Sequence, residues 1–538
     1  MLTADVQEDT ILRGERFTAR VAEICSTLPE VCPWPGLKYR RVLIPGILGG
    51  EIQFAQLAFI AHALRMRGAE ATGLLCDELL PACTARKVDH YESACRRWCY
   101  KNIRPFVQAA RLPHRWYSEF ITQREKDELA RVAGRVPPEK LRTFEYRGIP
   151  LGAHVDRSIE SYFKVGKFDL DNPKMVAQGR EFLTSAMYLT LISERALEEL
   201  RIDKVFMEDG EKTDWGVFRE VARHRGIPVE VVLGAPRGNA LLIERDRHPA
   251  PNDQMPLWPK WKDIPLTESQ NAELDEYFSR RAARPYEDHS WTSTAPIADP
   301  ADIRRQIGLP SSRSGLIFAI FPNLSYDAKL TTRCPTYDTA AEWVAETIRF
   351  FEPWPQHHLV VKIHPSERIQ QALDPTLDYL ADNFPALPDN VHVLPPETHL
   401  MAQDVLRVAD VALVYTSTVG VEAAYLGKPV VNVGGGWHAA RGYTMDVTRP
   451  EQYLDILADI CAGRRSCDPP KELGRRYAYA VFFRSLLPIR HFSAMYPRIT
   501  GLHLNSLHDL APGRDPTMDV ICRGVLLDEP FCREEERR

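Results

Sequence analysis

The chain has 538 residues, of which 44% are hydrophobic and 26% are charged, and these values are ordinary for a soluble enzyme. This length is enough for two domains, each with its own hydrophobic core. The formal net charge of −5 argues against a general nucleic-acid-binding protein. The first residues show no basic start followed by an apolar core, and no apolar run approaches the roughly 20 residues of a membrane-spanning helix. We therefore expect a cytoplasmic protein, and peripheral contact with the inner face of a membrane stays open.

The cysteines are 11 in number and are spread along the whole chain, which does not indicate a disulfide framework. One cluster stands out, formed by Cys76, Cys83, Cys95 and Cys99. Its spacing matches no standard zinc pattern. We expect buried thiols there and no metal site.

The first segment of α/β character begins at residue 42. Residues 42–44 predict a strand, residues 51–67 an amphipathic helix, and residues 71–76 the next strand. The loop between the first strand and the helix contains Gly46, Gly49 and Gly50. It does not match the dinucleotide-binding fingerprint. The loop is either a tight turn or a place where a substrate approaches the backbone.

Residues 77–145 are predicted to be helical and charged. Further along, residues 204–207 predict a short strand and residues 214–225 a helix, with Glu208, Asp209 and Gly210 between them. Two carboxylates at the end of a strand are candidates for a general base that activates a hydroxyl group. The alternative is a pair of surface carboxylates at a turn.

Residues 244–300 are rich in proline, tryptophan and charge, with a helix predicted near 267–283, and we place the boundary between two domains here. The predicted division is an N-terminal domain (1–265), a linker (266–300), a C-terminal domain (301–485) and a final segment (486–538). An apolar strand at GLIFAIFP opens the C-terminal domain. Asn323 and Asp327 follow in the next loop, near the predicted cleft.

Residues 359–363 predict a buried strand that is followed by Pro365 and Ser366. Proline suits the first turn of a helix, so His364 stands at the corner between strand and helix. Lys362 alternates with His364, and we expect both side chains on one face. A bound phosphate would attract a cation and an imidazole donor at this position, although a hydrogen-bonded corner histidine is the plainer interpretation.

Residues 411–414 predict another buried strand, and residues 430–433 the next parallel one, with a helix between them. The helix should begin at the carboxyl end of the first strand, with Ser417, Thr418, Val419 and Gly420. Free N–H groups and the helix dipole make such a position suitable for phosphate. Glu422 lies about one turn inside the helix, where its carboxylate could accept hydrogen bonds from a ribose. A plain βαβ unit with a capped helix is the alternative.

A glycine-rich loop follows residue 433. It includes His438, Arg441 and Thr444, which could close on a donor or an acceptor. The glycines of this loop could equally be turn residues.

The sequence resembles a known group of enzymes. The segments KIHPSE, NVHVLPPE, ADVALVYTSTVGVEAAYLGKPVV and RGYTMDV, in this order, are similar to the C-terminal half of GT-B glycosyltransferases. The similarity points to bacterial capsule and surface-polysaccharide biosynthesis transferases, which include Kdo transferases that use a CMP-linked sugar. The HP and Ser/Thr motifs resemble those of GT-B sialyltransferases, and Glu208-Asp209-Gly210 matches an acidic-acidic-glycine motif in their N-terminal domain.

The resemblance implies an α/β fold of the GT-B type, with two Rossmann-like domains facing an interdomain cleft and a C-terminal segment that returns toward the N-terminal domain. It implies metal-independent transfer of a sugar from a CMP- or UDP-sugar to a glycan or glycolipid acceptor, with no cofactor. Lys362, His364, Ser417 and Thr418 would stabilise the leaving phosphate, and Glu422 would hold the ribose.

For the base, Asp209 has a slight preference because it adjoins Gly210, where the backbone can approach a substrate closely. The resembled sialyltransferases use the first acidic position, which is Glu208 here.

Other functions stay open. A sugar-nucleotide 2-epimerase shares the fold and the nucleotide site, and a CDP-glycerol-type polyol-phosphate transferase uses similar positions. A non-catalytic GT-B scaffold in a polysaccharide assembly complex is an alternative of another class. The sequence does not reveal the sugar, the acceptor, the stereochemistry or the oligomeric state.

Overall fold

The computed structural model describes most of the chain. The described residues are 14–46, 50–84, 99–234, 237–247, 258–283, 297, 299–311, 315–324, 326, 336–434, 439–466, 469–495 and 498–533. They form two compact units. Unit 1 consists of Met1–Tyr162, Phe168–Pro249 and Ser485–Arg538, and unit 2 of Phe163–Lys167 and Ala250–Arg484.

Unit 1 contains a seven-stranded sheet in the order β13-β6-β5-β4-β1-β2-β3. Strands β1 to β5 run parallel, while β6 and β13 are antiparallel to their neighbours. The strands are β1 (Arg41–Pro45), β2 (Glu70–Leu75), β3 (His114–Trp116), β4 (Lys204–Glu208), β5 (Val229–Gly234), β6 (Ala240–Arg245) and β13 (Leu487–Pro488). A separate hairpin pairs β14 (Phe492–Met495) with β15 (Arg498–Leu502).

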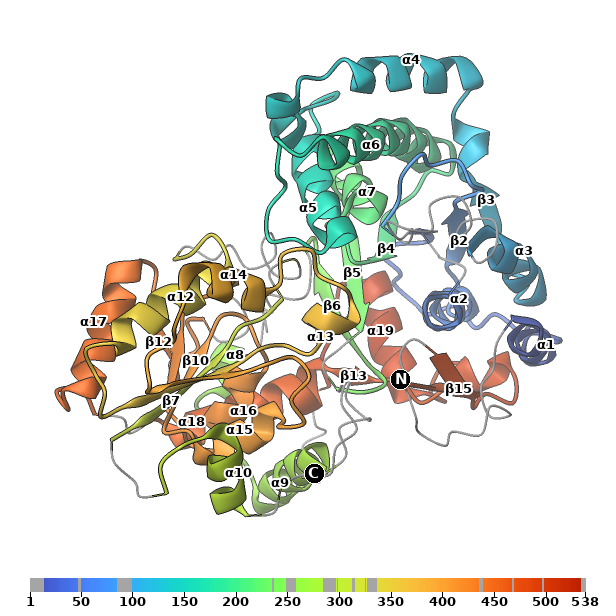
Figure 1. Ribbon diagram of the computed structural model, residues 1–538. Helices are drawn as coiled ribbons and strands as arrows, with labels where there is room; N and C mark the ends of the chain where they lie inside the picture. Colours follow the sequence, from blue (N-terminus) through green and yellow to red (C-terminus); the bar gives the residue numbers. More distant parts are fainter. Residues whose placement is uncertain are drawn as a thin grey trace. The chain divides into compact units, whose positions relative to one another are not determined.

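Helices cover both faces of this sheet (Figure 1). One face packs in a single apolar core against α1 (Gly14–Ile24), α2 (Glu51–Met66), α3 (Tyr100–Ala109) and α19 (Pro516–Leu527). The other face carries α7 (Thr213–His224), which packs against α6 (Pro173–Glu199). The remaining helices are α4 (Gln123–Gly134) and α5 (Leu151–Phe163), with short 3-10 turns at Tyr117–Phe120, Pro138–Thr143 and Leu507–Leu510.

Unit 2 contains a six-stranded, fully parallel sheet in the order β12-β11-β10-β7-β8-β9. The strands are β7 (Ile317–Phe321), β8 (His358–Lys362), β9 (Val391–Leu394), β10 (Val411–Val414), β11 (Val430–Asn432) and β12 (Met445–Asp446). Every residue of β7, β8 and β10 is buried, as expected for parallel strands that are covered on both faces.

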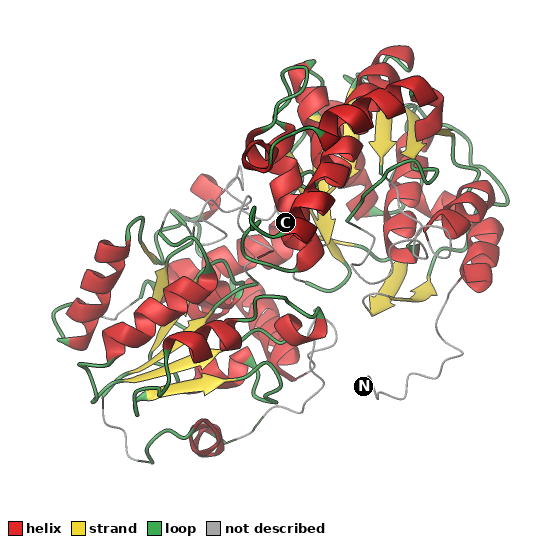
Figure 2. Ribbon diagram, turned by 45° about the horizontal axis from the view of Figure 1, so that its top comes forward, coloured by secondary structure: helices red, strands yellow, loops and turns green. Residues whose placement is uncertain are grey.

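One face of this sheet packs against α12 (Ala340–Phe351), α14 (Thr376–Asn383) and α17 (Pro450–Cys461). The other face meets α15 (Ala402–Val408) and α16 (Val419–Tyr425), and α18 (Lys471–Tyr479) packs on α16. Figure 2 shows the strands of both units between layers of helices. The other helices are α8 (Trp258–Trp261), α9 (Glu268–Ala283), α10 (Pro300–Ile307) and α13 (Ser366–Ile369), and a π-helical turn spans Ala480–Ser485.

The predicted α/β class is confirmed, and two Rossmann-like units with mainly parallel sheets are the components of a GT-B fold. The predicted strands at 42–44, 204–207, 359–363, 411–414 and 430–433 are present, with their ends shifted by at most one residue. The prediction that residues 77–145 are helical was wrong at β3, whose three residues are too few to show a strand pattern. The predicted cleft between the domains stays a prediction.

The two units divide the chain at a different place from the predicted boundary. The middle segment of unit 1 runs to Pro249, and residues 250–265 and the predicted linker 266–300 are assigned to unit 2. The reason is packing, because Trp258 and Trp261 are buried, and Trp258 contacts the ring of Tyr477 edge-on at 5.1 Å. Helix α9 likewise packs on α18. The segment rich in proline, tryptophan and charge indicated that a boundary between units lies nearby. It did not give the position of that boundary.

The C-terminal segment from Ser485 belongs to unit 1. Its helix α19 contributes Met518, Ile521 and Val525 to the main core. The buried Arg67 at the end of α2 donates to the carbonyl oxygen of Leu510 at 2.9 Å and to Asp519 at 2.5 Å. Unit 1 is therefore built from both ends of the described chain.

A buried ionic cluster ties the same segment to the sheet. Lys204 and Glu230 have fully buried side chains, and their Nζ and Oε1 atoms are 2.6 Å apart. Lys204 Nζ also lies 2.9 Å from Asp528 and 4.1 Å from the centre of the Tyr39 ring. Arg245 contacts the same Glu230 oxygen at 2.9 Å. These groups neutralise one another at the amino-terminal ends of β4 and β5.

Candidate functional site

The strand order of unit 2 reverses between β7 and β10. From β7 the chain proceeds outward through β8 and β9, and it then returns to β10 on the other side of β7. In open α/β sheets, ligands bind outside the carboxyl ends of the strands at such a reversal. Asn323 follows β7 and Thr416 follows β10, and the Asn323 amide donates to the Thr416 hydroxyl at 2.8 Å. The predicted Asn323 therefore lies at the reversal point, and Thr416 is a neighbour that the sequence did not single out.

The end of β8 supplies a buried cation. The Lys362 side chain is 7% exposed, and its Nζ donates to the carbonyl oxygen of Ile363 at 2.9 Å. Burial lowers the pKa of Lys362 to about 8. An anion bound nearby would stabilise the charged form of this amine and raise its pKa again.

The corner after β8 is built around His364. The strand ends at Lys362, so His364 lies beyond it in the corner, and the predicted common face of the two side chains stays a prediction. His364 instead accepts a hydrogen bond from the Ser366 amide to its Nδ1 at 3.1 Å, beyond Pro365 at the start of α13. The Ser366 side chain is fully buried. This geometry makes the imidazole Nδ1 an acceptor and assigns the ring proton to Nε2 when the ring is neutral.

The loop after β10 begins a helix as predicted. Thr418 is the N-cap residue of α16, and the Ser417 hydroxyl accepts from the Val419 amide at 3.3 Å. The Gly420 amide donates to the carbonyl oxygen of Ser417 at 3.1 Å. Two of the first amides of the turn are thus engaged locally.

Glu422 is held by its own unit. Its side chain is almost fully buried, with Arg281 Nε at 3.2 Å from one oxygen and Gln403 Nε2 at 2.8 Å from the other. Arg281 belongs to α9 and Gln403 to α15. A ribose hydroxyl at this carboxylate would therefore share it with, or displace, one of these two partners. Neither partner was foreseen from the sequence, because only tertiary packing brings them to Glu422.

The loop between β11 and β12 is fixed by Asp446. This carboxylate accepts hydrogen bonds from Asn432 at 2.8 Å, from Thr444 at 2.8 Å and from the Ala440 amide at 2.9 Å. Thr444 is thus engaged within the loop, and the guanidinium of Arg441 lies 5.9 Å from the centre of the Tyr477 ring. Three other predicted residues, Gly49, Asp327 and His438, lie outside the described residues.

The sheet of unit 1 has a reversal point of its own, between β1 and β4. Gly46 follows β1 with a φ of +72°, and a Cβ atom there would come within 2.7 Å of Trp215 Nε1. Glycine is therefore required at this turn for backbone conformation and for space. Gly50, further along the loop, is the N-cap residue of α2. The predicted Glu208 is the last residue of β4 and Asp209 follows it, so they lie at the same edge of the sheet as Gly46.

The two candidate bases differ in their surroundings. Asp209 has a φ of +60°, and its Oδ1 accepts from the amides of Glu211 at 3.0 Å and Lys212 at 3.3 Å, while Oδ2 pairs with Lys212 Nζ. Glu208 Oε2 is buried and has no hydrogen-bond partner among the described residues. The close neighbour of Gly210 is Val231 on the next strand, because a Cβ at Gly210 would lie 3.1 Å from its Cγ1.

Burial acts strongly on the carboxyl groups of this edge. It raises the pKa of Glu208 to about 7, with a smaller contribution from the charge of Asp209 and an opposing one from Lys212. It also raises the pKa of Glu211 to about 7, and that of Asp214 to about 6 against two hydrogen bonds from Thr84. Carboxyl groups with pKa values near neutrality suit proton transfer at physiological pH.

A polar face of α5 completes this region. His154, Arg157, Ser158 and Glu160 are all at most 5% exposed. The His154 Nδ1–H donates to the carbonyl oxygen of Glu211 at 2.5 Å, and the Ser158 hydroxyl lies 2.9 Å from that of Thr213. These residues were not predicted from the sequence, although polar side chains at helical spacing in an amphipathic helix were a signal that could have found them.

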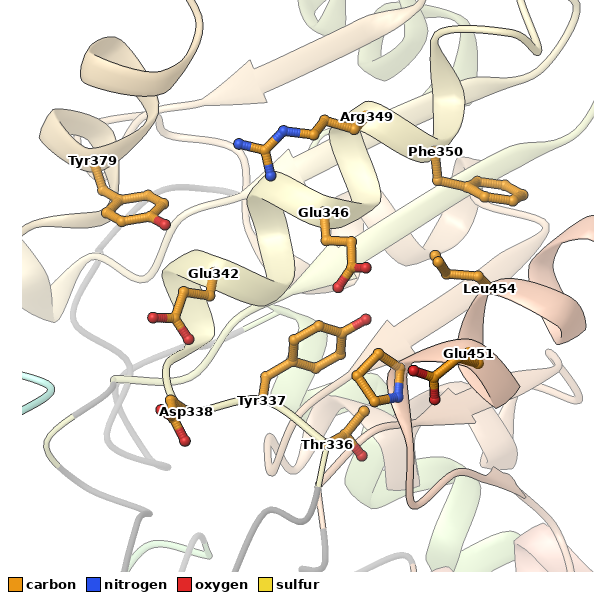
Figure 3. A pocket seen from close by; sticks show the side chains of 11 residues that line it. Thr336, Tyr337, Asp338, Glu342, Glu346, Arg349, Phe350, Tyr379, Glu451 and Leu454 are labelled. Carbon is orange, nitrogen blue, oxygen red and sulfur yellow. The ribbon is translucent and has the colours of Figure 1, made fainter.

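A groove of about 780 Å³ lies elsewhere in unit 2, between α12 and α17. Figure 3 shows Glu346 on α12 and Glu451 on α17 pointing into it beside the ring of Tyr337. None of the residues lining it was predicted to belong to the site.

Within the described ranges, no group of three or more His, Cys, Asp and Glu side chains is arranged to hold a metal ion. The described cysteines Cys76, Cys83 and Cys99 are half-buried and form no disulfide bond with a described residue, and Cys95 lies outside the described residues. Among the helices that the structure describes, none is long and apolar enough to cross a membrane.

The C-terminal part of the chain matches a known family. Residues 301–455 match the family model described as "Capsule polysaccharide biosynthesis protein". This range includes Asn323, Lys362, Thr416 and Glu422, so it covers the reversal point of unit 2. The resemblance to capsule biosynthesis proteins that the sequence predicted is confirmed for this part of the chain. No curated protein matches the chain.

Solved structures show weak likenesses. The β-Kdo 2,4 transferase of Thermosulfurimonas dismutans KpsC is 16% identical, with a TM-score of 0.35, and the match covers 58% of this chain and 87% of that one. A UDP-GlcNAc 2-epimerase from Neisseria meningitidis is 9% identical over 81% of this chain and 96% of its own, with a TM-score of 0.24. MurG of Acinetobacter baumannii is 12% identical over 82% and 94%, with a TM-score of 0.26. All of these TM-scores are below 0.5.

Proposed function

We propose that this protein is a glycosyltransferase of surface-polysaccharide biosynthesis that takes a sugar from a CMP- or UDP-sugar. The observation that carries the proposal is the reversal point of unit 2, where Asn323 and Thr416 meet, inside the range that matches the capsule family. Such a point is the usual ligand site of a parallel α/β sheet. The acceptor in this proposal is a hydroxyl group of a glycan or glycolipid.

The donor phosphate lies, in this proposal, among the strand ends of unit 2. Lys362 supplies the positive charge, and its low pKa reflects the burial of the amine away from solvent. The His364 Nε2–H and the hydroxyls of Ser417 and Thr418 supply further donors. Fixed donors in a site with little water stabilise the charge that develops on a leaving phosphate.

The acceptor hydroxyl is activated, in this proposal, by Glu208. Its Oε2 makes no hydrogen bond with a described residue, whereas both oxygens of Asp209 maintain the turn at Gly210. A base with a pKa near 7 is about half deprotonated at neutral pH and still accepts a proton readily. Asp209 is then a residue that shapes the turn.

We expect His364→Ala and Ser417→Ala each to weaken nucleotide binding by about 1 to 3 kcal/mol, the usual cost of losing a buried or charge-assisted hydrogen bond. A thermal-shift screen with CMP, UDP, GDP and CDP measures this, since a ligand at 100 times its Kd adds roughly 2.7 kcal/mol of stability. His399→Ala is the matched control, because this histidine is paired with Gln306 in the same unit and is not part of the proposed phosphate site. If both variants bind every nucleotide like the parent, the proposed donor site is wrong.

We expect transfer to continue in excess EDTA, because the proposed cradle uses a lysine, an imidazole and hydroxyl groups to stabilise the phosphate. The measurement is the rate of sugar transfer after the protein has been stripped of metal. A strict requirement for Mg²⁺ or Mn²⁺ in the chemical step would contradict this mechanism.

Incubation with a single nucleotide-sugar separates transfer from 2-epimerisation, since only an epimerase forms an isomer without an acceptor.

A further inference from the structure

Three buried polar atoms near the end of β4 have no hydrogen-bond partner among the described residues: Glu208 Oε2, Asp214 Oδ1 and Trp215 Nε1. Asp214 is 6% exposed and Trp215 is 7% exposed, so bulk solvent does not compensate for the missing bonds. Buried polar groups in native proteins nearly always have partners. Here one donor and two acceptors within eight residues of the sequence lack a partner. They point to a ligand that both accepts and donates hydrogen bonds.

Trp215 connects these atoms to the reversal point. Its indole nitrogen is the nearest atom to the position that a Cβ would take at Gly46, at 2.7 Å. The turn after β1 and the first turn of α7 therefore meet at the indole N–H. Glu208 lies at the end of β4, beside β1 in the same sheet.

Among the described residues at this edge, carboxylates outnumber cations. The described cations each have a near carboxylate: Lys212 pairs with Asp209, Arg219 contacts Glu220 at 2.9 Å, and Arg157 lies 3.6 Å from Glu160 and 3.8 Å from Glu211. Glu208 and Asp214 form no ion pair with a described residue. Protonation of a carboxylate at this edge is favourable because it reduces the negative charge. An additional anion at this edge would therefore be repelled.

We propose that this edge of unit 1 binds a neutral, polyhydroxylated part of the acceptor, with the Trp215 N–H donating to one of its oxygens. The same edge disfavours acidic sugars because Glu208 and Asp214 lie beside the bound group. This inference rests on the proposed function, and it names the chemical class of the acceptor group. Trp215 is thus a specificity-determining residue.

The test compares pairs of glycosides that differ only in a carboxylate. Methyl β-galactopyranoside and methyl β-galacturonide form one pair, and the corresponding glucoside and glucuronide form another. Binding to the full chain is measured by saturation-transfer NMR and titration. We expect the neutral member of at least one pair to bind about tenfold more tightly than its acidic partner, the scale of one uncompensated charge contact.

Trp215→Phe keeps the aromatic ring and removes only the N–H, and it should weaken binding of the neutral glycoside about five- to tenfold. Trp116→Phe is the matched control, since Trp116 is half-buried on β3 and packs against Tyr100 and His114. Glu208→Gln should reduce the difference in binding affinity between neutral and acidic glycosides. This second variant keeps the test decisive if Trp215→Phe does not fold.

Preference for the acidic glycosides, no binding of any glycoside, or unchanged binding by Trp215→Phe would overturn the inference. A nucleotide thermal shift on the same samples tests the proposed function separately. Nucleotide binding without glycoside discrimination rejects only the inference. Glycoside discrimination without nucleotide binding supports the inference about this edge and rejects the proposed donor site.

Discussion

Glu208→Gln is expected to lower the turnover of sugar transfer by about 100-fold or more, the usual scale of general-base catalysis. Nucleotide affinity should stay unchanged, because the proposed phosphate groups lie in unit 2 and Glu208 lies in unit 1. The measurement pairs initial rates with nucleotide titration. Glu346→Gln is the control, since it removes a carboxylate from the groove between α12 and α17. Full activity of Glu208→Gln would place the base elsewhere.

The pH dependence gives the same test a second readout. A base must be deprotonated, so kcat/KM of the parent should rise with pH through a midpoint near 7, the pKa that burial gives Glu208. Asp209→Asn should keep this midpoint, because Asn can still accept the two amide hydrogen bonds of the turn. If a variant at Asp209 loses the rise of kcat/KM with pH while Glu208→Gln retains it, Asp209 is the base and Glu208 is not.

The free energy of unfolding should change with pH in the direction opposite to that of kcat/KM. The pKa of Glu208 is higher in the folded state than in the unfolded state, so its contribution to stability is full at low pH and is lost as pH rises through about 7. Glu208→Gln should therefore be more stable than the parent by roughly 1 to 3 kcal/mol at pH 9, and equally stable at pH 4. Chemical denaturation at the two pH values measures the difference.

Lys204→Met is expected to destabilise unit 1 by about 3 to 5 kcal/mol, the cost of leaving a buried carboxylate without its partner. Glu230 is fully buried and lies 2.6 Å from Lys204, and only Arg245 would remain beside it. Urea unfolding followed by tryptophan fluorescence measures the loss. Lys140→Met, at an exposed position of the same unit, is the control and should change stability by less than about 0.5 kcal/mol.

The double variant Lys204→Met with Glu230→Leu separates charge from packing. Removing both charges leaves no buried carboxylate without a partner, so the double variant should regain much of the stability. An additive loss would show that shape complementarity, and not the unpaired charge, dominates the effect of Lys204→Met.

The strands could be predicted because parallel strands that are buried on both faces are short, continuous apolar runs. Residues 411–414 form such a run, and the structure has a strand with the same ends. The positions at the carboxyl ends of the strands could be placed for the same reason, and ligand sites in this fold class lie there. Asn323, Lys362, Ser417 and Glu208 occupy such positions, and their roles stay predictions.

The residues that the sequence did not reveal depend on contacts between distant elements. Arg281 reaches Glu422 across 141 positions of the chain, and no local pattern announces that pairing. The separate surroundings of Glu208 and Asp209 likewise arise from burial and from the left-handed backbone at Asp209. Glycine at position 210 is also required by its φ of +81° and by packing against Val231, and the sequence did not reveal this contact.

The return of the chain to unit 1 sets an order of events during synthesis. Ribosomes produce residues 250–484 before Ser485–Arg538, so unit 2 is complete while unit 1 still lacks part of its core. Until the C-terminal segment emerges, Arg67 has neither Leu510 nor Asp519, and Lys204 has no Asp528. A nascent chain halted after residue 484 would therefore expose the apolar surface of α2 and attract chaperones, whereas residues 250–484 form the part of the protein most suited to expression as an isolated fragment.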